Sequence, residues 1–249
     1  MSVTDIKESV PTSLVTESPW HNFAAQDAYT YILTGIQRGD RQEFWASGEH
    51  TVRDELLPII EQLGVERHTA LEIGCGVGRL LFPMSKHFEK VVGLDIAPEM
   101  IRQARLLASE RRIANADLFS ISQLDPSLSH VPNLNSRVDF IYSLLVFQHI
   151  EEFAFIEKYL GLVRACLSRM GVAYLQFDTR TETPLYRLKN ILPDSILPPY
   201  LRRGIRRIRR RPSDLERSFK KFGLAITKNI GQLSKYHCYV LRAGQSCGG

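Results

Sequence analysis

The sequence of 249 residues is poor in cysteine and lacks long apolar runs. Its four cysteines lie far apart and form no Cys-x-x-Cys pair, which argues against a zinc knuckle and a disulfide scaffold, so we expect reduced thiols and no metal site. The longest apolar runs, such as residues 141–147, are strand-sized, well short of the roughly 18 residues that a transmembrane helix needs. The N-terminus has no basic region followed by an apolar one, as a secretory signal would, and we expect a cytoplasmic protein.

Acidic residues are slightly fewer than basic ones, and the formal net charge of +5 comes from one short segment. Seven arginines lie between Arg202 and Arg211, and the rest of the chain holds 25 basic and 27 acidic residues. Leu201, Ile205 and Ile208 in this segment are spaced as on one face of a helix, which predicts an amphipathic basic helix. Such a helix could cover an acceptor pocket, bind an anionic substrate or a membrane surface, or bind nucleic acid, which is the least favoured of these partners.

Apolar periodicity divides the chain into parts of different character. We expect a mobile polar arm at residues 1–18, helices at 19–64, a core at 65–178, a variable insertion with the basic helix at 179–222, and a terminal β-hairpin at 223–249. In the core, short apolar segments alternate with amphipathic ones of helix length. The expected strands and helices are residues 70–73, a helix from about 79, 91–94, 98–111, 116–121, 138–142, 151–167 and 172–177. This alternation predicts a doubly wound α/β fold with a parallel sheet covered on both faces.

A glycine-rich turn joins the first core strand to the helix that follows it. Glu72 precedes Gly74, Gly76 and Gly78, and the next strand ends in Asp95. Glycines let the backbone approach a ligand, and a carboxylate at a strand end can accept hydrogen bonds from the two hydroxyls of a ribose. The combination predicts a nucleotide-like ligand. The alternative is a purely structural turn, with Asp95 capping the next helix.

The spacing of the glycines separates the possible nucleotide ligands. A dinucleotide-binding turn carries its third glycine at the position of Arg79, whereas here it comes one residue earlier, at Gly78. A phosphate-binding P-loop requires a Gly-Lys-Ser/Thr sequence, which does not follow. NAD, FAD and P-loop nucleotides are therefore disfavoured.

Together these motifs resemble those of class I S-adenosylmethionine-dependent methyltransferases. The first motif of that family, an acid followed by Gly-x-Gly-x-Gly, matches residues 72–78, and its ribose-binding acid matches Asp95. Residues 139–150 resemble the fourth strand and the segment after it, and residues 167–172 resemble the turn before the fifth strand. The resemblance covers residues 65–178 and implies a Rossmann-like seven-stranded sheet with a C-terminal antiparallel hairpin, an N-terminal helical extension, and S-adenosyl-L-methionine as cofactor.

The resemblance also implies roles for single residues. Glu72 would orient the methionine end of the cofactor and Asp95 would hold its ribose. Ser122 or Gln123 stands nearest to the place where many members have an acid that accepts from the adenine amino group. Trp45 either closes over the cofactor or packs in the core. The other residues implied to lie against the cofactor are the turn residues Gly74, Cys75, Gly76 and Gly78, the adenine-flanking Ile96 and Met100, and Ser143.

Methyl transfer from a sulfonium is an in-line displacement that needs no covalent enzyme nucleophile, but a hydroxyl or protonated amine acceptor needs a base. His149, just after the fourth strand, is the best-placed candidate, and its alternative role is to cap or pack the following helix. His237 and Tyr236 in the terminal hairpin are weaker candidates.

The segment after the fourth strand also bears on the acceptor. It lacks the Asn/Asp-Pro-Pro-Tyr/Phe motif of amino-nucleobase methyltransferases and the Pro-Cys pair of cytosine-C5 enzymes, so nucleobase methylation is disfavoured. We expect methyl transfer to a small molecule, anionic or linked to a lipid or glycan, with peripheral membrane contact through Arg202 to Arg211. The alternatives are a nucleic-acid-binding protein or RNA methyltransferase that uses these arginines, and a catalytically silent, cofactor-binding partner subunit.

Overall fold

The structure of the chain is a computed structural model that describes Trp20, residues 27–29, Ile32, and residues 40–121, 131, 134–198 and 206–244. Several predictions fall outside these residues. They are the mobile arm at 1–18, the cofactor contacts of Ser122 and Gln123, and the part of the basic helix before Arg206.

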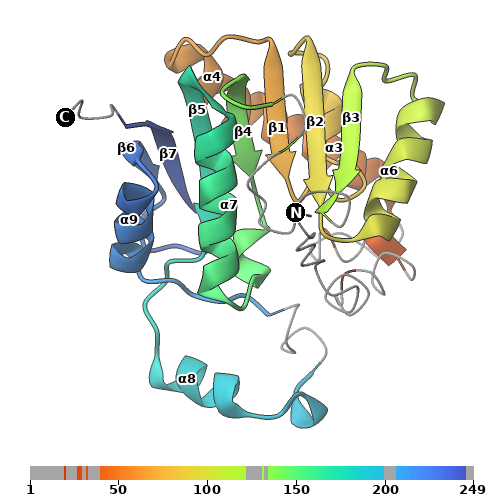
Figure 1. Cartoon of the computed structure of the whole chain (residues 1–249). Coiled ribbons are helices and arrows are strands. Elements are labelled where there is room, and N and C mark those ends of the chain that lie inside the picture. Colours follow the sequence, from red (N-terminus) through yellow and green to blue (C-terminus); the bar gives the residue numbers. More distant parts are fainter. Residues whose placement is uncertain are drawn as a thin grey trace, which may run out of the picture.

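A seven-stranded sheet with the order β3-β2-β1-β4-β5-β7-β6 forms the centre of the fold (Figure 1). Its strands are β1 (Thr69–Ile73), β2 (Lys90–Asp95), β3 (Ala116–Ser120), β4 (Val138–Ser143), β5 (Leu167–Phe177), β6 (Leu224–Ile230) and β7 (His237–Ala243). The first five strands run parallel, and β7 is antiparallel to both β5 and β6. The expected fold class, including the C-terminal antiparallel hairpin, is confirmed.

Helices cover both faces of this sheet (Figure 1). They are α3 (Arg41–Thr51), the π-helical η1 (Val52–Leu56), α4 (Leu57–Gln62), α5 (Leu81–Met84), α6 (Pro98–Glu110), the 3-10 turn η3 (Phe147–His149), α7 (Phe153–Cys166), α8 (Pro184–Ile191), the 3-10 turn η4 (Asp194–Ile196) and α9 (Pro212–Lys221). Leu71 and Ile73 of β1 face α7 and α9, whereas Ala70 faces η1, α4 and α6. The strands read as apolar runs because side chains on both faces are buried. In the described parts of the chain, no helix is long and apolar enough to cross a membrane.

Two core elements differ in length from the prediction. Strand β5 begins at Leu167 instead of residue 172, and the pairing with β4 shifts register between Val138 and Phe140. The helix expected from about residue 79 is only the four-residue α5, all of it buried. Pro83 in α5 cannot donate a backbone hydrogen bond, which limits how far a helix can extend there.

The predicted basic helix is wrong for residues 206–211, which we call the arginine segment. These residues are not helical, and Arg209 forms an isolated parallel bridge with Asp178, just after β5. The backbone N–H of Ile208 donates to the carbonyl of Gln148 at 2.7 Å, and that of Arg210 donates to the carbonyl of Asp178 at 2.8 Å. These long-range hydrogen bonds replace the local ones of a helix, so the spacing of the apolar residues did not decide the conformation.

Candidate functional site

The glycine turn adopts a backbone that L side chains rarely reach. The φ angles of Gly74, Gly76 and Gly78 are +76°, +54° and +96°. The N–H groups of Gly74 and Cys75 both donate to the carbonyl of Leu94, at 2.7 and 2.9 Å. The turn is therefore held against the end of β2, where Asp95 follows Leu94.

Close packing adds a second requirement for glycine in this turn. A Cβ atom at Gly74 would lie 2.3 Å from a methyl carbon of Val146, and one at Gly78 would lie 2.5 Å from the ring of Phe82. A Cβ at Gly76 would lie 2.7 Å from Ile32. The turn thus packs directly against the segment after β4 and against an N-terminal residue.

Replacing Gly74 by alanine is expected to lower the free energy of unfolding by about 2 kcal/mol, because the side chain adds strain at positive φ and overlaps Val146. Gly64→Ala is the matched control, since Gly64 has φ +60° but no heavy atom within 4 Å of its would-be Cβ. We expect it to cost about 1 kcal/mol or less. Urea denaturation measures both, and equal losses would show that the contact with Val146 does not matter.

Asp95 joins the turn to the start of α6. Its Oδ2 accepts from the N–H of Gly76 at 2.8 Å, and its Oδ1 accepts from the N–H of Ala97, the residue before α6, at 2.9 Å. The side chain is only 8% exposed, and burial raises the pKa of the carboxyl above its ordinary value. The backbone N–H of Ile96 also donates to this carboxylate, and three backbone donors leave about one of its roughly four acceptor positions for a ligand hydroxyl such as that of a ribose. The structural and ligand-binding interpretations of Asp95 are compatible.

Two predicted cofactor residues make contacts beneath the turn. Glu72 is buried, accepts from the hydroxyl of Tyr142 at 3.2 Å, and has a pKa well above its ordinary value because burial outweighs the attraction of Arg79. Ser143 is fully buried and donates to the carbonyl of Ile73 at 2.9 Å, which ties β4 to β1. In these contacts both side chains support the turn from within the sheet.

Cys75, Ile96 and Met100 lie near Asp95 along the chain or in space but differ in exposure. Cys75 is buried, and burial raises the pKa of its thiol well above the ordinary value, so it is not a nucleophilic thiolate. Met100 is 1% exposed and packs in the small cluster that includes Val77. Ile96 is only partly buried, so among these three it has surface left for a ligand.

Trp45 is partly buried and packs against core residues, which is one of the two roles expected for it. Its ring stacks on Phe82 at 5.8 Å, and Phe82 in turn lies against Gly78. The guanidinium of Arg111 lies 3.7 Å from the centre of the Trp45 ring. Arg111 follows the C-terminal end of α6, whereas Asp95 precedes its N-terminal end. These contacts favour the packing role, and closure over the cofactor stays a prediction.

His149 lies at the same carboxyl edge of the sheet as the turn. It ends η3, its N–H donates to the carbonyl of Val146, and Val146 is the residue that packs on Gly74. The ring of Trp20 approaches it edge-on, with centroids 5.4 Å apart. Sequence reasoning missed Trp20, for which the only signal was a tryptophan next to a polar arm.

The terminal hairpin reaches this edge as well. His237 pairs with Phe177, the last residue of β5, and its Nδ1 lies 2.9 Å from the hydroxyl of Thr179. The ring is buried, and burial lowers the pKa of His237. Tyr236, the residue before it, is 44% exposed. His237 therefore faces a protein hydroxyl and remains the weaker candidate base.

The arginine segment runs along the edge beside His149. Arg207 donates to the side-chain oxygen of Gln148 at 2.8 Å, and Arg210 donates to the carbonyl of Ile150 at 2.6 Å. Gln148 and Ile150 flank His149, so the arginine segment contacts the residues on both sides of His149. The sequence could not place it, because it follows Gln148 by more than fifty residues.

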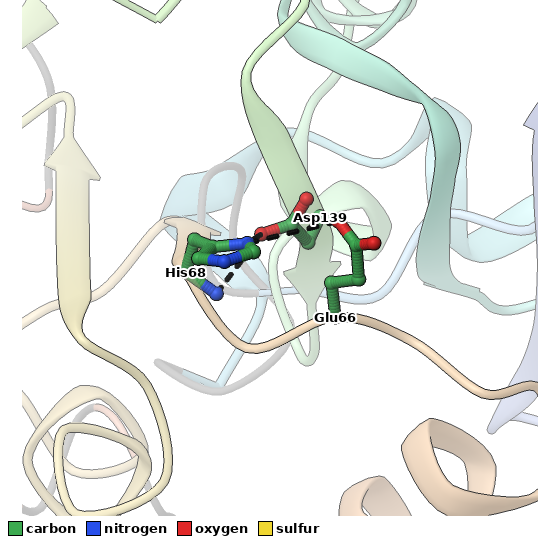
Figure 2. A group of neighbouring side chains, drawn as sticks. All are labelled: Glu66, His68 and Asp139. Atoms are coloured by element: carbon green, nitrogen blue, oxygen red, sulfur yellow. Dashed lines mark hydrogen bonds and ion pairs between the residues drawn. The ribbon is translucent and has the colours of Figure 1, made fainter.

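A separate polar group lies at the opposite edge of the sheet (Figure 2). Glu66, His68 and Asp139 gather there, with Nδ1 of His68 3.7 Å from Glu66 and 3.5 Å from Asp139. Asp139 Oδ2 also accepts from the backbone N–H groups of His68 and Thr69, at 3.1 and 3.0 Å. These contacts hold the start of β1 against β4, and because parallel strands share their direction, the group is remote from Asp95.

Known proteins resemble the chain in this region. Residues 71–173 match the model of a family described as a methyltransferase domain. An uncharacterised RNA methyltransferase of Nostoc is 32% identical over 107 residues, which are 41% of this chain and 23% of the relative. A ubiquinone biosynthesis O-methyltransferase of Rhodopseudomonas palustris is 23% identical over 164 residues, 65% of this chain and 60% of the relative. The chain thus spans less than two thirds of the length of both curated relatives.

A solved structure extends the likeness to almost the whole chain. Magnesium protoporphyrin IX methyltransferase from Synechocystis, with S-adenosylhomocysteine bound, superposes with a TM-score of 0.60 at 19% identity, over 92% of this chain and 97% of the other. At that identity the likeness concerns the fold. The glycine turn, Asp95 at the end of β2 and the strand order agree with the match to a methyltransferase domain over residues 71–173, and this part of the chain resembles the S-adenosylmethionine-dependent methyltransferases of class I.

Proposed function

We propose that the protein transfers a methyl group from S-adenosylmethionine to a small-molecule acceptor, including one linked to a lipid or glycan. The observation that carries the proposal is the hydrogen bond between Asp95 and Gly76, which joins the ribose-binding acid to the glycine turn at the carboxyl edge of the sheet. Ligands of doubly wound sheets bind at this edge. The likeness to a ubiquinone O-methyltransferase and a protoporphyrin methyltransferase supports a small-molecule acceptor.

The chain's own residues divide the work of such a reaction. Asp95 and the glycine turn hold the nucleoside, and the bound cofactor supplies an electrophilic methyl carbon. His149 stands at the same edge and removes the proton of a hydroxyl or amine acceptor as the new bond to carbon forms. The arginine segment and Trp20 border His149, and they position the acceptor and limit its contact with water.

An RNA acceptor is the alternative, because one relative is named as an RNA methyltransferase. In the described part of the chain the structure argues against RNA binding by the arginine segment. Arg207, Arg209 and Arg210 donate to protein carbonyl and amide oxygens and do not form one exposed basic face. A second alternative is a subunit that binds the cofactor but catalyses no transfer. Only an activity assay distinguishes such a subunit from an enzyme.

Calorimetric titration and methyl labelling test the proposal. We expect saturable binding of S-adenosylmethionine and S-adenosylhomocysteine, and no binding of NAD at the same concentrations. Labelled cofactor is then incubated with the protein and, in parallel, with organic extracts, RNA and protein fractions. Label in a small molecule of the organic extract is expected, whereas label in RNA would favour the alternative, and no cofactor binding by folded protein would refute the proposal.

A further inference from the structure

Arg206 is a buried cation with few partners. Its side chain is 10% exposed, and its one ion pair in the described residues is a long one, 3.9 Å from Nη2 to Glu151, whose side chain is 42% exposed. Its Nε and Nη1 atoms are buried and have no hydrogen-bond partner in the described structure. Burying a charge without partners costs several kcal/mol, so a guanidinium in this condition is unusual unless a ligand completes it.

Arg206 is one of three arginines whose charges act on Lys189. The pKa of Lys189 on α8 is lowered first by burial and then by the positive charges of Arg206, Arg209 and Arg180. Arg180 already pairs with buried Asp178, with its Nε 3.0 Å from Oδ1. Of these four cations, only Arg180 and Arg206 have an ion pair in the parts of the chain that the structure describes, with Asp178 and Glu151 respectively.

The packing of Arg209 shows that its charge is also incompletely matched. It donates to the carbonyl of Thr181 and lies 4.3 Å from the centre of the Tyr186 ring, while its buried Nε has no hydrogen-bond partner in the described structure. Of the four cations, Arg209 lines a cleft of about 420 Å³, whose other charged lining residues are Arg210, Arg211 and Arg217 and the acids Glu157, Glu182 and Asp214.

The position of this group relates it to the acceptor. Ile208, two residues after Arg206, bonds to the carbonyl of Gln148, the neighbour of His149. Arg206 itself approaches Glu151, two residues after His149. One small molecule can therefore contact both the proposed base and the cations.

We infer that Arg206, Arg209, Arg180 and Lys189 form a binding site for an oxyanion, a phosphate or carboxylate group carried by the acceptor. An oxyanion would accept from the unpartnered Nε of Arg206 together with Nη2, whose ion pair to Glu151 is long, because Nε and Nη2 form one edge of the guanidinium. That the anion belongs to the acceptor rests on the proposed function. The anion site itself rests only on the burial and the unmatched charge of Arg206 and its neighbours.

Direct binding of simple anions tests this site without cofactor. Pyrophosphate and benzoate are titrated calorimetrically at low ionic strength into wild type, Arg206→Met and the control Arg53→Met, whose arginine is 64% exposed and paired with Asp54. We expect saturable binding of at least one anion to wild type and to the control, and a Kd at least about tenfold higher for Arg206→Met. No binding to wild type, or equal binding to Arg206→Met, would overturn the site.

Thermal unfolding separates a ligand-binding role from a structural one. Without anion, Arg206→Met should be at least as stable as wild type, because the change removes a poorly matched buried charge. The anion should raise the Tm of wild type and not that of the variant. A variant that is less stable than wild type without anion, and responds to the anion as wild type does, would show that Arg206 is structural and would overturn the inference.

Vesicle flotation distinguishes the sources of the anion. If the headgroup of a lipid supplies it, wild type should float with phosphatidylglycerol vesicles and not with phosphatidylcholine vesicles, and Arg206→Met should lose this binding. If a soluble acceptor supplies the anion, Arg206→Met should change the calorimetric affinity for the anions, and neither wild type nor the variant should float with the vesicles. Loss of vesicle binding or of calorimetric anion binding in Arg206→Met supports the anion site. Failure of the protein to bind S-adenosylmethionine would refute the proposed function and would not change the anion result.

Discussion

Replacing His149 by alanine should lower kcat for methyl transfer by about 100-fold or more while leaving the Kd of S-adenosylmethionine unchanged. The expectation follows from its place at the end of η3, where Val146 links it to the glycine turn and Gln148 links it to the arginine segment. Histidine titrates near neutral pH and can take a proton from the acceptor. The rate is measured with the acceptor that the labelling experiment identifies.

His68→Ala is the matched control for this experiment. Its side chain is 62% exposed and lies at the opposite edge of the sheet, so its removal should leave kcat unchanged. The pH profile gives a second readout, because loss of a base should abolish the rise of kcat with pH through the neutral range. Full activity of His149→Ala would remove the base assignment and leave His149 as a packing residue against Trp20.

Replacing Asp95 by alanine should raise the Kd of S-adenosylmethionine by about 100-fold, the effect expected from losing a charge-assisted hydrogen bond to the ribose. The change also leaves the N–H groups of Gly76 and Ala97 without their acceptor, which loosens the turn that receives the nucleoside. Asp95→Asn keeps one oxygen acceptor and should fall between wild type and alanine. Titration calorimetry measures all three.

Asp117→Ala controls for the loss of an acid on a neighbouring strand. Asp117 lies on β3, is 49% exposed and pairs with Lys90, so its removal should not change the affinity for the cofactor. A circular dichroism spectrum and an unfolding curve for Asp95→Ala separate lost binding from lost folding. An unchanged Kd in a folded Asp95→Ala variant would place the nucleoside elsewhere.

The glycine turn and Asp95 could be predicted because the residue types that they require depend only on the local backbone. Positive φ angles require glycine, and the end of a buried strand is marked by the change from apolar residues to a carboxylate. Trp45 could not be placed in the same way. An aromatic residue at the N-terminal side of the core suits both a cofactor lid and plain packing, and its contacts with Phe82 and Arg111 come from the tertiary structure.

The basic helix failed as a prediction for a different reason. The spacing of Leu201, Ile205 and Ile208 favours a helix, but periodicity counts only local contacts. In the structure the backbone of residues 206–211 bonds to Gln148 and Asp178, which lie tens of residues earlier in the chain. These tertiary hydrogen bonds stabilise the observed conformation more than the weak local preference for a helix stabilises a helical one.

The sequence by itself determined the parallel sheet, the class of the domain and the cofactor turn, because buried strands and positive φ angles each leave their mark within a few residues. Tertiary structure decided which side chains surround His149. Trp20, Gln148 and Arg206 come from three distant parts of the chain and meet only at the carboxyl edge of the sheet. Whether an arginine is exposed or buried depends on what packs over it, and that information is absent from the local sequence.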